Sequence, residues 1–348
     1  MGYLGRSPTP SPIDTSDIPA NSIDASKIID GAIAVADVAD NAITEDKIAD
    51  AAVVSLKSGR KNLIINGGFD VWQRGTTHSN TNDFHADRWG NGSTTCTTTK
   101  EVENNKNYLR MTGTSASSTP NLYQRLEYTF YDETISVSFY ARSSIVQTIN
   151  IVWKDADGTI FDTQSFTTSS SWQRFTFQFT NSTLTTSGNY IVLYPALSTG
   201  DTFDIKDYQL ELGSVATDFE HRSYGEELAL CQRYFEKLTF ANGTMMILHK
   251  VNSTAAYGGF SYKHKRTQNP TITLPTAVNN GSSVNGCSML TMVGGFPPAV
   301  GTVATSEHSS NWARFNVLNW PANGGTGDST WLYFTGTSDP YITVDAEL

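Results

Sequence analysis

Three pairs of neighbouring carboxylates are the residues of this 348-residue chain whose types and spacing best suit acid–base chemistry. The pairs are Asp155/Asp157, Asp201/Asp204 and Glu226/Glu227. Hydrolysis of a glycosidic bond needs two carboxyl groups about 5–10 Å apart across a cleft. Each pair also has a structural explanation: a tight turn, a strand start, and a first helical turn, where the dipole favours acids. The sequence has no G-x-S-x-G, H-E-x-x-H or P-loop motif, so we predict no catalytic residues.

Residues of metal-binding type occur in one short stretch, which contains His78, Asp83, His85 and Asp87. Their spacing matches no established metal site, so we interpret the stretch as a surface loop. The chain has three widely separated cysteines, Cys96, Cys231 and Cys287. They never form a C-x-x-C motif, which predicts free buried thiols, no metal site and no cofactor.

One segment near the end of the sequence alternates apolar residues with aromatic and hydrogen-bonding ones. The second set comprises Trp312, Arg314, Asn316 and Trp320, and Trp331, Tyr333 and Tyr341 could extend it. Flat aromatic faces with nearby polar groups suit sugars, whose C–H faces stack while their hydroxyls form hydrogen bonds. The same aromatics would also suit burial between subunits, because large apolar patches usually mark interfaces. Both hypotheses stay open at this stage.

The dense basic run Tyr-Lys-His-Lys-Arg spans residues 262–266. In a chain of net charge −10, Lys263, Lys265 and Arg266 could attract phosphate or acidic sugars. The alternative is an ordinary solvated loop.

The composition indicates which elements would position these residues. Charged residues make up 17% of the chain, against about 25% in ordinary soluble domains, while aromatics reach 11%. Such a composition favours β-sheet over helix. The acidic balance argues against nucleic acid as a partner. No apolar run approaches the ~20 residues of a membrane helix, and the first residues show no secretory signal, so we expect no membrane insertion.

Residues 13–54 carry branched apolar side chains at a strict spacing of five. The positions are Ile13, Ile18, Ile23, Ile28, Ile33, Val38, Ile43, Ile48 and Val53. Neither a helix nor a strand brings such a series onto one face, so a single chain would not bury it. Small repeat units bury their apolar face only against neighbours. We therefore predict an intertwined homo-oligomeric shaft over residues 13–60, with a monomeric pentapeptide-repeat coil as the alternative.

Residues 1–12 contain a proline-rich run that includes Ser7, Pro8, Thr9 and Pro10. Proline is excluded from the interiors of helices and sheets. We interpret this segment as an extended arm that docks on another protein.

Residues 61–222 show short alternating segments between turn signals, which is typical of a β-sandwich. Alternation is clearest at 135–140, 149–153 and 174–179, and Asp157-Gly158 predicts a hairpin. Further strands are expected near 107–112, 122–130, 189–194 and 202–212. About eight strands are enough for a two-sheet jelly roll.

The same region contains a series of short motifs. They are NLIINGGF at 62–69, WQRG at 72–75, ADRW at 86–89, SFYAR at 138–142, WQRF at 172–175, QLELGSVAT at 209–217 and CQRYF at 231–235. Together they resemble a domain that recurs in bacteriophage tail fibre and tail proteins and is similar to carbohydrate-binding jelly rolls. We expect Trp72, Trp89 and Tyr140 to pack in the core or at a sheet edge. Arg74, Asp87 and Arg88 are expected to tie loops to the sandwich by charge-assisted bonds.

One helix is predicted over residues 223–238. Ser223 and Glu226 form a capping box at its start. An apolar seam follows at steps of four and three residues, namely Tyr224, Leu228, Cys231, Phe235 and Leu238. This seam would pack on the sandwich or around a three-fold axis.

Residues 239–348 are predicted to form a second β domain, the tip. Candidate strands are 244–251, 258–262, 271–274, 288–293, 313–319, 331–335 and 341–344. The resemblance then implies a homotrimeric phage tail fibre that is assembled in the host cytoplasm and resides in the virion tail. Its arm would attach to a tail adaptor or tube protein, and its distal β domains would bind a bacterial surface glycan or protein. The alternatives are a polysaccharide depolymerase tailspike and an accessory virion fibre without a receptor.

Overall fold

The computed structural model describes residues 60–79, 83–116, 119–130, 132–181, 188–241, 244–252, 255–267, 269–273, 286–291, 302–318, 329–335 and 341–347. The predicted arm with Ser7–Pro10, and the isoleucines and valines of the predicted shaft, lie outside these residues. Within them the chain is mainly β, with one helix and four antiparallel sheets. None of the described helical residues forms a segment long and apolar enough to span a membrane.

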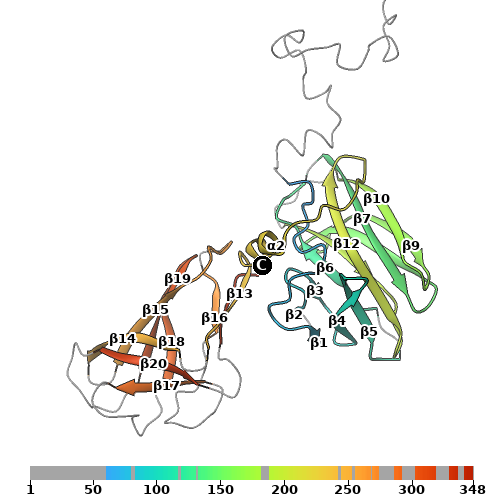
Figure 1. Ribbon diagram of the computed structural model, residues 1–348. Coiled ribbons are helices and arrows are strands. Elements are labelled where there is room, and N and C mark those ends of the chain that lie inside the picture. The colour runs from blue at the N-terminus through green and yellow to red at the C-terminus, as the bar shows by residue number, and fades with distance from the viewer. Residues whose placement is uncertain are drawn as a thin grey trace, which may run out of the picture.

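Strands β1–β12 form two six-stranded sheets that pack as a β-sandwich (Figure 1). The first sheet has the order β1 (Thr77–His78), β4 (Cys96–Glu103), β5 (Lys106–Gly113), β12 (Thr202–Leu212), β7 (Glu133–Ser143), β10 (Gln173–Asn181). The second has the order β2 (Asp83–Phe84), β3 (Gly90–Asn91), β6 (Leu122–Arg125), β11 (Asn189–Tyr194), β8 (Gln147–Asp155), β9 (Ile160–Thr168).

The predicted alternation is confirmed, because it sends one face of each sheet into a single core. Val137 and Phe139 of β7 and Ile151 and Trp153 of β8 are fully buried in that core. Phe139 also contacts Phe166 of the opposite sheet, with ring centroids 5.3 Å apart. Each large apolar side chain buried in this way contributes about 1.5–3 kcal/mol. The two sheets are therefore held together by the alternating residues that the sequence displays.

The predicted hairpin at Asp157-Gly158 joins β8 to β9. Gly158 has a φ of +90°, a conformation that glycine adopts without strain, and the Asp155 carboxylate accepts a hydrogen bond from the Thr159 amide at 2.7 Å. Among its described residues the sandwich has twelve strands, whereas about eight were predicted. The strands β1, β2 and β3 have two residues each, too few to show any alternation in a sequence.

Helix α2 (Tyr224–Cys231) begins at the predicted capping box. The Ser223 amide donates to the Glu226 carboxylate at 2.9 Å, and the Glu226 amide donates to the Ser223 hydroxyl at 3.3 Å. Leu228 and Cys231 pack with apolar residues of the 65–71 segment of the sandwich. This packing is the first of the two arrangements considered for the helix.

The prediction of one helical seam through Leu238 is wrong. The helix ends at Cys231, and Phe235 and Leu238 belong to strand β13 (Phe235–Thr239). Tyr224, at the other end of the predicted seam, is 59% exposed. The reason is a long-range ladder, since all five residues of β13 pair with β21 at the far end of the chain.

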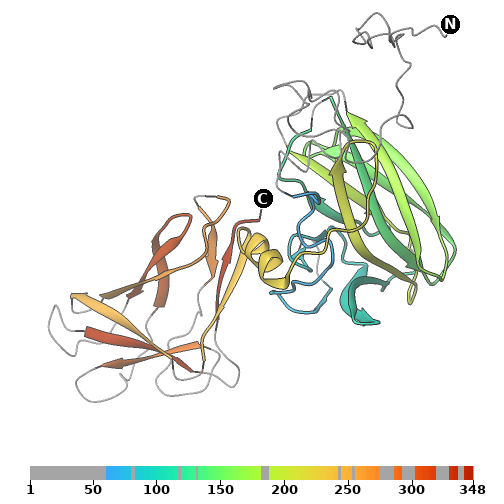
Figure 2. The same cartoon turned by 45° about the horizontal axis from the view of Figure 1, so that its top comes forward.

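The tip contains two sheets, both visible in Figure 2. The small sheet has the order β13, β21 (Tyr341–Asp345), β16 (Thr271–Thr273). The larger has the order β17 (Gly286–Thr291), β20 (Ser329–Thr335), β14 (Met245–Asn252), β15 (Ala255–Ser261), β19 (Trp312–Leu318), β18 (Thr302–His308). Seven of these strands match predicted ones, whereas β13 and β18 were not predicted.

The tip and the sandwich meet at two arginines of the 72–89 loop. The Arg74 guanidinium lies 3.6 Å from the Phe235 ring centre, and the Arg88 guanidinium lies 3.6 Å from that of Tyr234. Arg74 also pairs with Asp345 at 3.2 Å, and Arg88 pairs with Glu347. Arg74 and Arg88 therefore form charge-assisted bonds, as expected. The bonds join them to a loop of the sandwich and also to the last described residues of the tip. In both ribbon views the C-terminal end lies beside α2 (Figures 1 and 2).

Candidate functional site

Three central strands of the second sheet place Arg125, Tyr190 and Lys154 in one row. Tyr190 on β11 pairs directly with Arg125 on β6 and with Lys154 on β8. The adjacent residues Ile191 and Trp153 are in the core. Because side chains alternate along a strand, the row points away from the core toward solvent.

The next outward row supplies a second aromatic ring. Tyr123 on β6 pairs with Gly90 on one side and Val192 on the other. Its ring meets that of Tyr190 edge to face, with centroids 5.8 Å apart and planes at 61°. Phe84 meets Tyr123 in the same way at 6.3 Å and 70°. Such pairs add about 0.5–1.5 kcal/mol beyond area burial, so the three rings form a fixed apolar surface.

Two glycines beside the rings leave room for them. A Cβ at Gly90 would lie 2.5 Å from the Tyr123 ring, and one at Gly92 would lie 2.7 Å from the Asn121 amide oxygen. Heavy atoms do not approach so closely without a shift. The Tyr123 ring can therefore lie flat against β3 only because residue 90 has no side chain.

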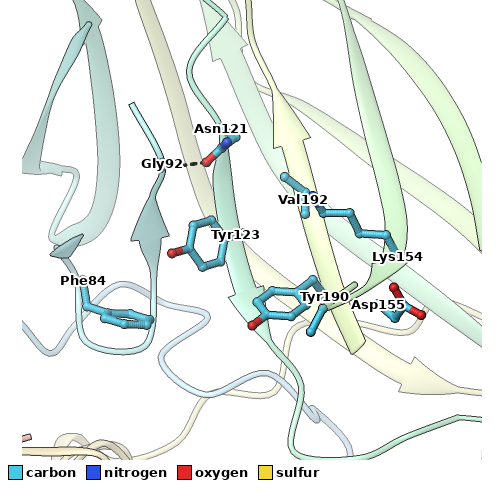
Figure 3. A pocket seen from close by; sticks show the side chains of 9 residues that line it. Phe84, Gly92, Asn121, Tyr123, Lys154, Asp155, Tyr190 and Val192 are labelled. Atoms are coloured by element: carbon cyan, nitrogen blue, oxygen red, sulfur yellow. Dashed lines mark hydrogen bonds between the residues drawn. The ribbon is translucent and has the colours of Figure 1, made fainter. Parts of the chain in front are cut away.

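These residues enclose a pocket of about 320 Å³ on the outer face of the second sheet (Figure 3). It is lined by Phe84, Gly92, Asn121, Tyr123, Lys154, Asp155, Ala156, Tyr190 and Val192. The volume falls at the lower end of the range for small-molecule sites. A pocket of this size holds one or two ring-sized groups of a ligand.

The rim of the pocket carries a few polar groups. The Asn121 amide oxygen accepts a hydrogen bond from the Gly92 amide at 2.7 Å, so its NH₂ group is oriented by this contact. The Lys154 ammonium donates to the Tyr194 hydroxyl at 3.3 Å. Burial raises the pKa of Tyr123, so its phenol is neutral at physiological pH and can donate a hydrogen bond. An aromatic floor with amide, ammonium and phenol groups can bind a ligand that has both apolar and hydroxylated faces.

Solved structures that resemble this chain include carbohydrate-binding modules. A CBM4 structure matches at 19% identity over 42% of this chain and 97% of its own, with a TM-score of 0.34. TmCBM61 in complex with β-1,4-galactotriose matches at 14% identity over 44% and 99%, with a TM-score of 0.32. The enzymatically active domain of tailspike protein 4 of bacteriophage CBA120 matches at 14% over 43% of this chain and 21% of its own (TM-score 0.33). No family model and no curated protein matches the sequence.

The receptor-binding residues predicted from the sequence belong to the tip and not to the pocket of the sandwich. Trp312 is 42% exposed beside the buried Ala313, as the alternation of that strand predicts. The Arg314 guanidinium lies over the Tyr257 ring at 5.0 Å. Of the remaining predicted residues, Trp320 and the side chains of Asn316, Trp331 and Tyr333 lie outside the described part of the structure. None of the described tip residues lines the pocket of the sandwich.

The prediction that the whole basic run contacts a ligand is wrong for Lys265. Its side chain is fully buried, and its ammonium bonds Glu236 at 2.7 Å and the Gln232 carbonyl at 2.6 Å. Arg266 is exposed but donates to the Glu127 carbonyl of the sandwich at 3.3 Å, while Lys263 is exposed. This loop therefore helps to join the tip to the sandwich.

The pocket residues were missed as a site, although a signal was present. The strand prediction at 189–194 was correct, and in it Tyr190, Val192 and Tyr194 alternate with the core residues Ile191 and Leu193. Two outward tyrosines on a central strand indicate an aromatic outer face. The sequence does not show that Tyr123 and Phe84 lie beside them.

At least one carboxylate of each pair takes part in a structural contact. Asp204 bonds Arg110 and Arg142, and Glu227 bonds Arg222. Glu226 caps the helix and Asp155 closes a turn.

The residues of metal-binding type form a ring contact, in which the rings of His78 and His85 stack at 4.8 Å. Within the described ranges, no group of three or more His, Cys, Asp or Glu residues is placed to hold a metal ion. Cys96 and Cys231 are buried free thiols, as predicted.

Proposed function

We propose that the protein binds a glycan in the pocket over Tyr123 and Tyr190. The observation that carries this proposal is the outward pair of tyrosine rings with an amide and an ammonium group at the rim. The apolar C–H face of a sugar packs on such rings, and its hydroxyls can bond Asn121 and Lys154. Fixed aromatic side chains with a few placed polar groups are the usual composition of a small-molecule site.

In this proposal the glycan is bound and not cleaved. Asp155 is the one carboxylate among the described residues that line the pocket, whereas glycoside hydrolysis needs two. Its oxygen is engaged by the Thr159 amide in the hairpin turn. These contacts favour a binding role over a depolymerase.

We place this binding role in a phage tail fibre that attaches the virion to its host. The sequence motifs of residues 62–238 and the five-residue repeat support this proposal, as does the second β region at the tip. A homotrimer would present three pockets and gain avidity through effective concentration. Light scattering of the full chain tests this point: the trimer has three times the 38.0 kDa mass of one chain, and a single-chain mass contradicts it.

A glycan array probed with the full chain tests the binding role. Wild-type protein should bind a subset of bacterial surface glycans, and Tyr190→Ala should weaken that binding about tenfold, since a stacked ring contributes roughly 1.5 kcal/mol. Tyr140→Ala is the matched control, because Tyr140 lies on β7 of the first sheet, away from the pocket. Equal binding by wild type and Tyr190→Ala, or no binding by either, contradicts the proposal.

A further inference from the structure

We propose that the pocket selects acidic glycans, with a sugar carboxylate held between Lys154 and Arg125 above Tyr190. This inference rests on the proposed glycan binding and adds the class of ligand. Its basis is the cross-strand row, in which a cation flanks the tyrosine on each side. Neighbouring strands lie about 4.8 Å apart, so the two cations are anchored roughly 10 Å apart, which is wide enough to bracket one sugar ring.

Lys154 has no carboxylate partner among the described residues. Within the described residues, ion pairs within 4.0 Å join Lys61, Lys106 and Lys265 to acids, whereas the Lys154 ammonium donates to the Tyr194 hydroxyl. A phenol leaves the charge of the ammonium uncompensated. An anion at the rim of the pocket would gain a charge-assisted hydrogen bond there.

Arg125 is not part of the pocket lining but lies next to it, on the other side of Tyr190. Its guanidinium carbon lies 5.8 Å from the centre of the Tyr190 ring. Gly188, with a φ of +80°, lies against the same group: a Cβ there would be 3.0 Å from Nε and Nη2. The absence of a side chain at residue 188 therefore leaves space for the guanidinium. A planar guanidinium at this position suits a carboxylate better than a neutral hydroxyl.

The acids near this row are buried. Asp155 is 5% exposed and bonds the Thr159 amide. Glu347, whose charge acts on Tyr123, has a buried side chain paired with Arg88. Two cations, Lys154 and Arg125, and one carboxylate, Asp155, therefore lie around Tyr190, so the formal charge of these groups is positive in a chain of net charge −10. A local positive field of this kind raises the local concentration of anionic ligands.

Matched pairs of polysaccharides test the inference on the full-length protein. Each acidic bacterial polysaccharide is compared with its carboxyl-reduced form, in which the uronic acids have become neutral hexoses, alongside neutral and phosphorylated glycans. The bound glycans should be carboxylated, and reduction should weaken binding about tenfold, the typical effect of one charge-assisted bond. Raising the salt from 50 to 500 mM should weaken binding to the native acidic glycan.

Other outcomes separate this inference from the proposed function. Binding to neutral or phosphorylated glycans only, or no effect of carboxyl reduction, overturns the acidic specificity and leaves glycan binding intact. Binding to no glycan at all overturns both.

Variants that each remove one positive charge test whether Lys154 and Arg125 bind the sugar carboxylate. Lys154→Met and Arg125→Gln should each lose about tenfold in affinity for the acidic glycan and little for its reduced form. Lys106→Met removes the same charge from a half-exposed side chain on the first sheet and should bind like wild type. Melting temperatures check that each variant is folded. Unchanged affinity in both Lys154→Met and Arg125→Gln contradicts the inference.

Discussion

Asp204 holds two guanidinium groups on the outer face of the first sheet. It pairs across the strands with Arg110 and Arg142. Its oxygens accept from Arg110 Nε at 2.7 Å and Nη2 at 2.9 Å, and from Arg142 Nε at 2.8 Å. The Asp204 carboxylate is 2% exposed, whereas the Arg110 and Arg142 side chains are 30% and 20% exposed and Arg142 also pairs with Glu103.

Removing the charge of Asp204 should destabilise the folded state. Asp204→Asn is expected to lower the free energy of unfolding by about 2 kcal/mol, since it weakens the charge-assisted hydrogen bonds from two guanidinium groups to a buried carboxylate. Urea denaturation measures the change. Asp157→Asn, on the exposed hairpin turn, is the control and should stay within about 0.5 kcal/mol of wild type. A loss below about 1 kcal/mol for Asp204→Asn would show that the network is not stabilising.

Asp87 is a buried carboxyl at the junction with the tip. Burial raises its pKa from 3.8 to about 6, although hydrogen bonds from Gln73 and the charge of Arg74 act in the opposite direction. The folded state therefore binds this proton more tightly than the unfolded chain does. The resulting stabilisation is complete below about pH 3.8 and is lost as the pH rises through about 6.

Comparison with Asp87→Asn isolates this effect, because asparagine does not titrate. The free energy of unfolding of wild type relative to the variant should fall by about 2 kcal/mol between pH 4 and pH 7, which covers most of the effect of a shift of about two units. Urea titrations at several pH values measure it. A relative stability that is flat or rises with pH would contradict the raised pKa.

At the scale of elements, β3 and β6 set the floor of the pocket. Gly90→Ala should displace the Tyr123 ring and weaken glycan binding about tenfold while the fold is retained, because the new Cβ would meet the ring at 2.5 Å. Calorimetry with a bound glycan and a melting curve measure both effects. Gly225→Ala is the control, since nothing lies within 4 Å of its Cβ. Full binding by Gly90→Ala would mean that the ring position is unimportant.

Elements with a regular local pattern were predictable from the sequence. Strands such as β7, β8 and β10 follow their alternation, and α2 follows its capping box. Strand β13 was not predictable from the sequence, because Phe235 and Leu238 continue the helical spacing of α2. What makes this segment a strand is its pairing with β21, and local propensity does not contain a partner so distant in the chain.

The candidate site, like β13, could not be predicted in full from the sequence. The outward position of Tyr190 follows from alternation within one strand. Its neighbours Arg125 and Lys154 come from strands before it in the chain, and only the sheet order β6-β11-β8 brings them together. The sequence pointed instead to aromatics of the tip, where a single strand carries both rings and polar groups.

At the scale of the whole molecule, the last described residues bind back onto the sandwich. The side chains of Arg88 and Glu347 are 2% and 4% exposed and pair with each other. The pairing joins the 72–89 loop to the end of the tip, and Arg88 also donates to the Arg125 carbonyl at the end of β6. The pocket strand and the tip therefore share one buried contact.

A double-mutant cycle measures this contact. Arg88→Met and Glu347→Gln should each destabilise by about 3 kcal/mol, and the double variant by clearly less than their sum, because the second change removes an already unpaired charge. Urea denaturation gives the four free energies. Additivity within about 0.3 kcal/mol would show that the two side chains do not interact.

The central claim is that glycan binding occurs over Tyr190 and Tyr123. A crystal structure of the full-length protein with a glycan selected from the array tests it most directly. The account predicts sugar density on the outer face of the second sheet, stacked on these two rings, with a carboxylate near Lys154 and Arg125. Density at the tip beside Trp312, with the sandwich pocket empty, would contradict it.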